Sequence, residues 1–168
     1  MRVLVGSWPA YGHLLPMLPL IRAAQRAGHE VRVTSGAGPG FDPAVLGPLP
    51  PTVLVAPYLP QAAVLPYCRA VVSHAGAGTL LGALCHGLPQ LCLPQGTDQP
   101  SNTAALLPTG AALALDPGEI TADAVADRLG RLLGEPSFTA AAGRLRAEIE
   151  RMPSADEVLP QLLGGAGR

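Results

Sequence analysis

Segments typical of β-strands alternate with segments typical of helices along most of this 168-residue chain. The expected strands are short apolar or alternating runs at residues 2–5, 30–34, 53–56, 70–73, 90–93 and 111–115. Because this alternation favours parallel strands joined by helices that cross over the sheet, we predict an α/β fold. The expected architecture is a single Rossmann-like, doubly wound, mostly parallel sheet of about six strands with C-terminal helices.

Apolar residues at helical spacing predict the helices. The expected positions are residues 14–27, 61–65, 79–85 and 99–106, followed by helices in the C-terminal part. Thr121 has the residue type of an N-cap for a helix that carries Val125, Leu129 and Leu132. The next helix is expected to carry Phe138, Ala142, Leu145, Ile149 and Met152, and a capping-box pattern at Ser154 and Glu157 predicts a terminal helix.

The length of the chain suits one domain with a full core, so residues 1–168 are expected to form a single Rossmann-like domain. Residues 1–34 contain one strand–helix–strand unit. Residues 35–51 are rich in Gly and Pro, which predicts a loop or linker. Residues 52–168 contain the remaining strand and helix patterns and the residues with chemistry.

Composition and charge exclude several classes of function. Hydrophobic residues make up 48% and charged residues 14% of the chain, which is typical of a globular protein. The net charge of −1 provides no field for nucleic acid or an anionic membrane surface, so neither is expected as a partner. The three cysteines form no CxxC motif, so neither a metal site nor a disulfide framework is expected. No run has the pattern of a signal peptide or a membrane span, and a cytoplasmic location is the expectation.

A strand, a glycine-rich turn and a helix start follow one another at Val71–Thr79. In open α/β sheets ligands bind at the carboxyl ends of strands, where the N–H groups and dipole of a helix N-terminus favour phosphate. Gly76 and Gly78 would let the backbone approach a diphosphate closely. The Thr79 hydroxyl and the His74 ring could donate hydrogen bonds to it. Because glycine-rich turns are common, this stretch alone is equally compatible with a plain turn and a satisfied histidine.

Two further groups of polar or aromatic residues follow neighbouring strands and are expected at the same edge of the sheet. Asp98 and Gln99 offer a carboxylate and an amide, which together can read the hydroxyls of a sugar. Tyr58 can stack on a base, and Gln61 can bond the edge of that base. Taken alone, the first pair is more often a helix N-cap and the second a proline turn with a half-buried tyrosine. Their convergence with the His74 turn favours a nucleotide-sugar site.

The turn also resembles a loosened dinucleotide-binding fingerprint, Gly76-x-Gly78-x-x-x-Gly82, with Asp98 downstream. The third glycine is displaced by one position, however, and the turn lies in the middle of the chain. Asp98 also comes several residues after its strand rather than at the strand's end. A nicotinamide-binding oxidoreductase is therefore the disfavoured alternative.

An ordered set of motifs resembles the donor-binding signature of family 1 glycosyltransferases of the GT-B fold, especially bacterial enzymes that glycosylate macrolides and other natural products. The motifs are Tyr58-x-Pro60-Gln61-x-x-x-Leu65, His74-Ala-Gly76-x-Gly78-Thr79, Gly87-x-Pro89, Pro94-x-x-x-Asp98-Gln99 and Asn102. The resemblance implies that His74, Gly76, Gly78 and Thr79 hold the diphosphate of a UDP or TDP sugar, Tyr58 and Gln61 the base, and Asp98 and Gln99 the sugar. Where Tyr58 stands, the family usually has tryptophan.

The N-terminus resembles the opening of the acceptor domain in the same family, which makes His13 the matching general base. A neutral imidazole can take a proton from an acceptor hydroxyl as that hydroxyl attacks the anomeric carbon. By resemblance, the reaction would invert the anomeric centre, use a small hydroxylated acceptor and need no cofactor or metal. Most of the acceptor domain is missing, so the chain corresponds to half of a GT-B architecture, shortened within residues 36–51.

Three functional hypotheses remain open from the sequence. The first is a glycosyltransferase, and the second is an inactive nucleotide-sugar-binding module or remnant of one. The third is the disfavoured oxidoreductase. Because both GT-B domains begin with a strand–helix–strand unit, residues 2–34 are hypothesised to replace the missing first unit of the donor domain in one sheet. An acceptor pocket would then require a second chain, which makes a homo-oligomer compatible with the sequence.

Overall fold

The described strands form one parallel sheet. The computed structural model describes residues 2–7, 30–35, 48, 51, 53–56, 60–153 and 157. Its strands are β1 (Arg2–Ser7), β2 (Glu30–Ser35), β3 (Val53–Ala56), β4 (Val71–Ser73), β5 (Gln90–Cys92) and β6 (Ala112–Ala114). They lie in the order β3-β2-β1-β4-β5-β6, and every pair is parallel. This order, which reverses between β1 and β4, is that of a doubly wound Rossmann sheet and confirms the predicted fold class.

The N-terminal strands share the sheet with the strands of the later segment. β1 pairs with β4 so that Leu4 lies opposite Val71 and Val5 opposite Val72. On its other side β1 pairs with β2, and β2 pairs with β3. Residues 2–7 and 30–35 are therefore joined to the 53–114 strands by ladder hydrogen bonds.

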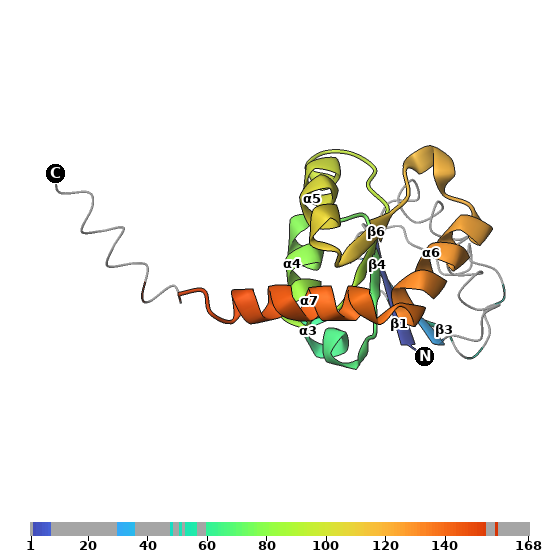
Figure 1. The fold of residues 1–168 in the computed structure, drawn as a ribbon. Helices are drawn as coiled ribbons and strands as arrows, with labels where there is room; N and C mark the ends of the chain where they lie inside the picture. The colour runs from blue at the N-terminus through green and yellow to red at the C-terminus, as the bar shows by residue number, and fades with distance from the viewer. Residues whose placement is uncertain are drawn as a thin grey trace.

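Helices cover both faces of the sheet (Figure 1). The described α-helices are α3 (Gln61–Val64), α4 (Ala77–Cys85), α5 (Gln99–Leu106), α6 (Ala122–Gly134) and α7 (Pro136–Ile149). Short 3₁₀ turns, η3 (Leu65–Tyr67), η4 (Leu107–Thr109) and η5 (Pro117–Glu119), follow α3, α5 and β6. Figure 1 shows α4 and α5 on one side of the sheet and α6 on the other, with α7 crossing the end of the molecule.

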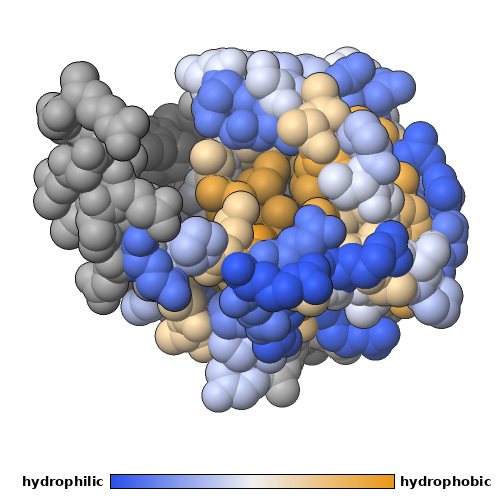
Figure 2. Space-filling model, turned by 60° about the vertical axis from the view of Figure 1, so that its left-hand side comes forward, coloured by the Kyte–Doolittle hydropathy of each residue, from blue (hydrophilic) through white to orange (hydrophobic). Residues whose placement is uncertain are grey.

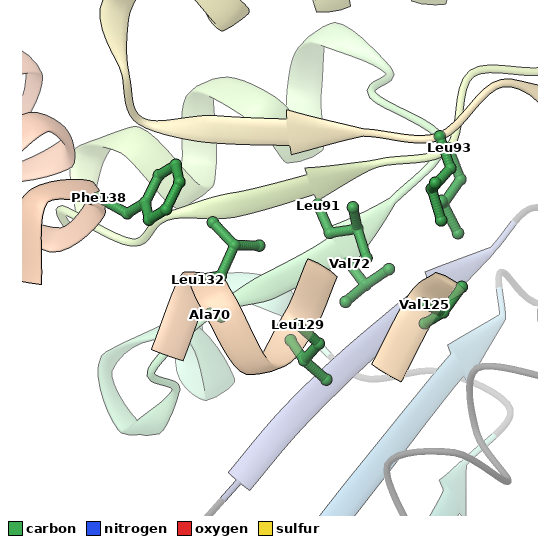
Figure 3. Packing of buried hydrophobic residues seen from close by; sticks show 9 residues of the cluster. Ala70, Val72, Leu91, Leu93, Val125, Leu129, Leu132 and Phe138 are labelled. Carbon is green, nitrogen blue, oxygen red and sulfur yellow. The ribbon is translucent and has the colours of Figure 1, made fainter. Parts of the chain in front are cut away.

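The apolar side chains of α6 form the core on one face. Val125, Leu129 and Leu132 pack with Val72 of β4 and Leu91 of β5, all nearly fully buried. Figure 3 shows Leu132 of α6 pointing toward the strands, with Val125 and Leu129 on the same helix and Phe138 of α7 at one end of the cluster. The spacing of the α6 residues is the helical repeat that the sequence predicted, and the Thr121 hydroxyl accepts from the Ala124 N–H as the predicted N-cap.

The opposite face is built largely from small side chains. α4, α5 and α7 pack there in a buried cluster that contains Ala75, Leu80, Leu84, Cys92, Leu106, Ala111, Ala112, Ala141 and Ala142. Burial raises the pKa of the Cys92 thiol to about 11, and the neighbouring Thr103 hydroxyl lowers it by a smaller amount. Cys92 is therefore a protonated core residue at neutral pH rather than a nucleophile.

The structure corrects two expected helix limits. α4 begins at Ala77 rather than Thr79, because Gly76 is extended and its carbonyl accepts the first helical hydrogen bond, from Leu80. α7 ends at Ile149, so Met152, which was expected on this helix, lies beyond it with 69% of its surface exposed. The expected helix at 14–27 and the Ser154 cap lie outside the described residues. Within the described part of the chain, no helix is long and apolar enough to span a membrane.

Candidate functional site

The loop after β4 makes a tight turn into α4. Ala75 is buried and takes a left-handed conformation, with φ of 64°, and its N–H donates to the Ser73 hydroxyl at 3.1 Å. The Ser73 carbonyl accepts from the N–H of Leu93, which begins the loop after β5. Ser73 thus fixes the turn and holds the two loops side by side at the carboxyl edge of the sheet.

The His74 ring lies against Gly76. A Cβ built on Gly76 would stand 2.6 Å from His74 Nε2, which is closer than any real contact of that kind. Glycine is therefore required at 76 if the ring is to keep this position. The ring is half-buried, and it is the smallest of the influences that lower the pKa of the Asp98 carboxyl. His74 and Asp98 thus lie on the adjoining loops that follow β4 and β5.

The N-terminus of α4 has no side-chain cap. Gly76 occupies the N-cap position, and Ala77, Gly78 and Thr79 form the first turn without an acidic residue. The first backbone N–H groups of a helix have no partner within the helix and attract anions. At the start of α6, by contrast, the Thr121 hydroxyl accepts such a hydrogen bond. The first turn of α4 is therefore suited to an anionic group beside His74.

Two of the residues predicted to contact the ligand form a hydrogen bond with each other. Gln61, at the start of α3, donates from Nε2 to the Thr79 hydroxyl oxygen at 3.0 Å. Because the Thr79 oxygen already accepts this bond, its own hydrogen is directed elsewhere and can be donated. The two residues had been assigned to different parts of a ligand, the base and the diphosphate. Their contact places both parts of the expected site next to the N-terminus of α4.

The Gln99 side chain stabilises the loop after β5 through hydrogen bonds to its backbone. The Gln99 side chain is buried, and its Oε1 accepts from the N–H groups of Gln95 at 2.8 Å and Gly96 at 3.2 Å. Gly96 and Thr97 follow with positive φ values of 158° and 57°. The carbonyl oxygen of the amide thus shapes the loop that carries Asp98, a use that its position in the sequence did not reveal.

Asp98 stands at the N-cap position of α5, but its carboxylate does not cap the helix. One oxygen, Oδ1, accepts from the Thr97 hydroxyl at 3.0 Å, and the other, Oδ2, accepts from Asn102 Nδ2 at 2.8 Å. Asp98 is exposed to solvent. Each oxygen can therefore still accept a further hydrogen bond from a hydroxyl group of a ligand. This geometry favours the binding interpretation of Asp98 over the N-cap interpretation.

We expect the Asp98 carboxyl to titrate below the usual range of an aspartate. The hydrogen bond from Asn102 lowers its pKa most, and the hydrogen bond from Thr97 and the nearby His74 act in the same direction. Because the folded pKa is depressed, the contribution to stability is present above the unfolded pKa and is lost as the pH falls through the folded pKa. A carboxyl ¹³C NMR titration should show Asn102→Ala moving the transition upward and the exposed Ser101→Ala leaving it in place. An unchanged transition in Asn102→Ala would contradict this assignment.

Most of the predicted site residues lie together at one edge of the sheet, and two of them are not among the described residues. His74, Gly76, Gly78, Thr79, Gln61, Asp98 and Gln99 all lie on the loops and helix starts at the ends of β3, β4 and β5. Tyr58 and His13 fall outside the described residues. Over the described ranges, no three His, Cys, Asp or Glu side chains gather in a way that could hold a metal ion.

Sequence reasoning gave no role to Asn102 and did not single out Ser73. Asn102 follows Asp98 by four positions on a helix, and residues at that spacing lie on the same helix face. That spacing alone could have predicted their contact. The bond between Ser73 and Ala75 joins residues two positions apart, which is typical of a serine turn.

An apolar groove opens beside the site on the outer surface of α4 and α5. It has a volume of about 260 Å³, and its lining is Ala77, Leu80, Leu81, Leu84, Asn102, Ala105, Leu106, Thr109 and Leu145. Figure 2 shows apolar side chains gathered in a hollow on this side of the molecule, with polar side chains around them. Ala77 and Asn102 stand where the groove meets the site.

A family profile described as "Erythromycin biosynthesis protein CIII-like, C-terminal domain" matches residues 20–164. Aklavinone 7-beta-L-rhodosaminyltransferase of Streptomyces galilaeus is 38% identical over 152 residues, which are 90% of this chain and 34% of that protein. TDP-daunosamine transferase DnrS of Streptomyces peucetius is 45% identical over 119 residues, or 70% of this chain and 28% of that protein. The chain therefore spans about a third of the length of these curated relatives.

Solved structures give the same picture for the fold. The glycosyltransferase VinC, crystallised in complex with DTDP, superposes with a TM-score of 0.82 at 29% sequence identity. The superposition covers 96% of this chain and 40% of VinC. The resemblance that the sequence motifs suggested is confirmed by these matches.

Proposed function

Because this chain belongs to the family of Erythromycin biosynthesis protein CIII-like C-terminal domains, we propose that it binds a nucleotide diphosphate sugar at the carboxyl ends of β4 and β5. The nucleotide is TDP or UDP, and the name of the relative DnrS and the complex of VinC with DTDP favour TDP. The diphosphate lies at the first turn of α4, with His74 beside it. The Asp98 carboxylate accepts hydrogen bonds from hydroxyl groups of the sugar.

One observation carries this proposal most directly. An uncapped helix N-terminus, a histidine ring packed against Gly76 and an exposed carboxylate that does not cap its helix all lie on two adjoining loops. The first two suit a diphosphate, and the third suits a polyol. In the same proposal, Tyr58 and Gln61 contact the base of the nucleotide. Gln99 contacts the sugar through its Nε2.

The activity of the full-length relatives is the second part of the proposal. A protein that contains this half would transfer a sugar from the nucleotide to a hydroxyl of a small natural-product acceptor, with inversion at the anomeric carbon. In this chain His13 would act as the general base, without a metal or cofactor. The alternative is a binding module or remnant that holds the nucleotide sugar and does not turn it over.

Calorimetric titration of the purified chain with TDP, UDP and NAD tests the binding proposal. We expect heat of binding with at least one of the two nucleoside diphosphates and none with NAD. Heat with NAD alone would support the oxidoreductase hypothesis. No heat with either diphosphate would contradict both the glycosyltransferase hypothesis and the inactive-module hypothesis.

Turnover is tested separately, with a TDP sugar and a panel of hydroxylated aromatic and macrolide acceptors. Product formation that is lost in His13→Ala, while TDP binding remains, would support an enzyme with His13 as its base. Binding without product for any acceptor would support the inactive module.

Gly78→Ala should raise stability and lower affinity at the same time. A Cβ at Gly78 meets no atom within 4 Å, so alanine in this helical turn should raise the free energy of unfolding by about 0.5–1 kcal/mol. The same methyl group would occupy space that the diphosphate approaches, and TDP binding should weaken. Gly130→Ala on α6, equally open, is the matched control and should stabilise without changing TDP binding. Unchanged TDP affinity in Gly78→Ala would place the diphosphate elsewhere.

The surroundings in which the protein works are part of the same proposal. A cytoplasmic location suits a site for a nucleotide sugar, and the low net charge of −1 gives no reason to expect a nucleic acid partner. A second copy of the chain could supply an acceptor pocket, and sedimentation or light scattering would measure whether a homo-oligomer forms.

A further inference from the structure

The amide of Asn102 ties the two loops of the site together. Its Nδ2 donates to the Ala75 carbonyl at 3.1 Å and to Asp98 Oδ2 at 2.8 Å. Ala75 belongs to the loop after β4 and lies 27 positions away in the chain, whereas Asp98 belongs to the loop after β5. Because an amide nitrogen carries two hydrogens, each acceptor takes one of them.

This arrangement fixes the direction of the Asp98 carboxylate. Thr97 holds Oδ1 and Asn102 holds Oδ2, so rotation of the carboxylate would break a hydrogen bond at either oxygen. The second bond of Asn102 connects the carboxylate to the turn that carries His74. The loop that contacts the diphosphate and the loop that contacts the sugar would then hold their relative position before the ligand binds. Such a preorganised site loses less entropy on binding.

We propose that Asn102 is a positioning residue for recognition of the sugar half of the nucleotide sugar. It holds the Asp98 carboxylate at a fixed place relative to the His74 turn and acts on the ligand only through Asp98. This inference rests on the proposed function and adds a role that the sequence motifs did not assign. It predicts that Asn102 matters for the sugar and much less for the nucleotide.

The variant Asn102→Ala tests the inference by calorimetry with two probes, TDP and TDP-glucose. The ratio of TDP-glucose affinity to TDP affinity should fall about three- to tenfold, because one positioned hydrogen bond is lost on the sugar side. TDP affinity should change little. A merely structural role would lower both affinities together, so an unchanged ratio would overturn the inference.

Folding of the variant is not expected to limit this experiment. Asn102 is half-buried at the rim of the apolar groove, so truncation opens toward solvent rather than leaving a closed cavity. Asn102→Asp is a second variant of the same size, which replaces the donor with a carboxylate facing Asp98. It should lower the ratio at least as much. The neighbouring Ser101→Ala, exposed on α5, is the matched control and should keep the wild-type ratio.

A double-mutant cycle with Asp98→Asn shows whether Asn102 acts through Asp98. Once the carboxylate is gone, Asn102→Ala should have no further effect on the ratio, whereas full additivity would overturn the inference. The two proposals fail differently. A wild-type chain that binds neither TDP nor TDP-glucose contradicts both, whereas TDP binding with a ratio that Asn102→Ala leaves unchanged contradicts this inference alone.

Discussion

Replacing His74 with alanine should weaken TDP binding by about 10- to 100-fold, since a hydrogen bond to a charged group contributes about 1.5–3 kcal/mol. The ring lies over Gly76, at the entrance to the uncapped first turn of α4, where the proposal places the diphosphate. Its removal leaves the helix N-terminus in place, so binding should weaken rather than disappear. Calorimetric titration with TDP measures the loss.

His86 is the matched control for this experiment. It lies at the other end of α4, at the C-cap, and is half-buried like His74. His86→Ala changes the same residue type next to the same helix but away from the carboxyl edge of the sheet, so TDP affinity should stay at the wild-type value. Thermal unfolding of both variants reports whether the fold is intact. If His74→Ala bound TDP as the wild type does, the ring would not contact the diphosphate.

Replacing Leu132 with alanine should lower the free energy of unfolding by about 2–5 kcal/mol, because the change leaves a cavity as well as losing buried apolar surface. Leu132 is 1% exposed and packs between α6 and the sheet in the cluster that contains Leu91 and Phe138 (Figure 3). Domains are commonly stable by only about 5–15 kcal/mol, so this single change removes a large share of the total. Urea unfolding followed by circular dichroism measures it.

Leu81 provides the comparison for this loss. It is also a leucine within an α-helix, but 53% of its surface is exposed. Leu81→Ala should change the free energy of unfolding by less than about 0.5 kcal/mol, as is usual for surface positions. Equal losses in the two variants would mean that the α6 layer does not form the stabilising core of this face.

Much of the fold could be predicted because it depends on local patterns. The apolar runs of β3 to β6 and the helical spacing of Val125, Leu129 and Leu132 follow from which side chains must be buried. The limits of elements were less predictable. Met152 has the right spacing for α7, but the helix has already ended at Ile149, and nothing in the apolar pattern marks that end.

The site was predictable as a place rather than as a set of contacts. Parallel strands bring their carboxyl ends to one edge, so the loops with His74 and Asp98 had to be neighbours. The partners of the side chains were not predictable in the same way. Gln99 has the residue type of a sugar ligand, yet its Oε1 accepts from Gln95 and Gly96 of its own loop. The roles of His13 and Tyr58 stay predictions.

The sequence by itself determined the α/β class, the order of its elements and the edge where the chemistry gathers, because these depend on burial and on the direction of parallel strands. Only the tertiary structure decided how distant groups meet. The bond of Gln61 to Thr79, the reach of Asn102 to Ala75 and the pairing of β1 with β4 join residues far apart in the chain. Such contacts depend on the register between whole elements, and no local pattern of residues encodes that register.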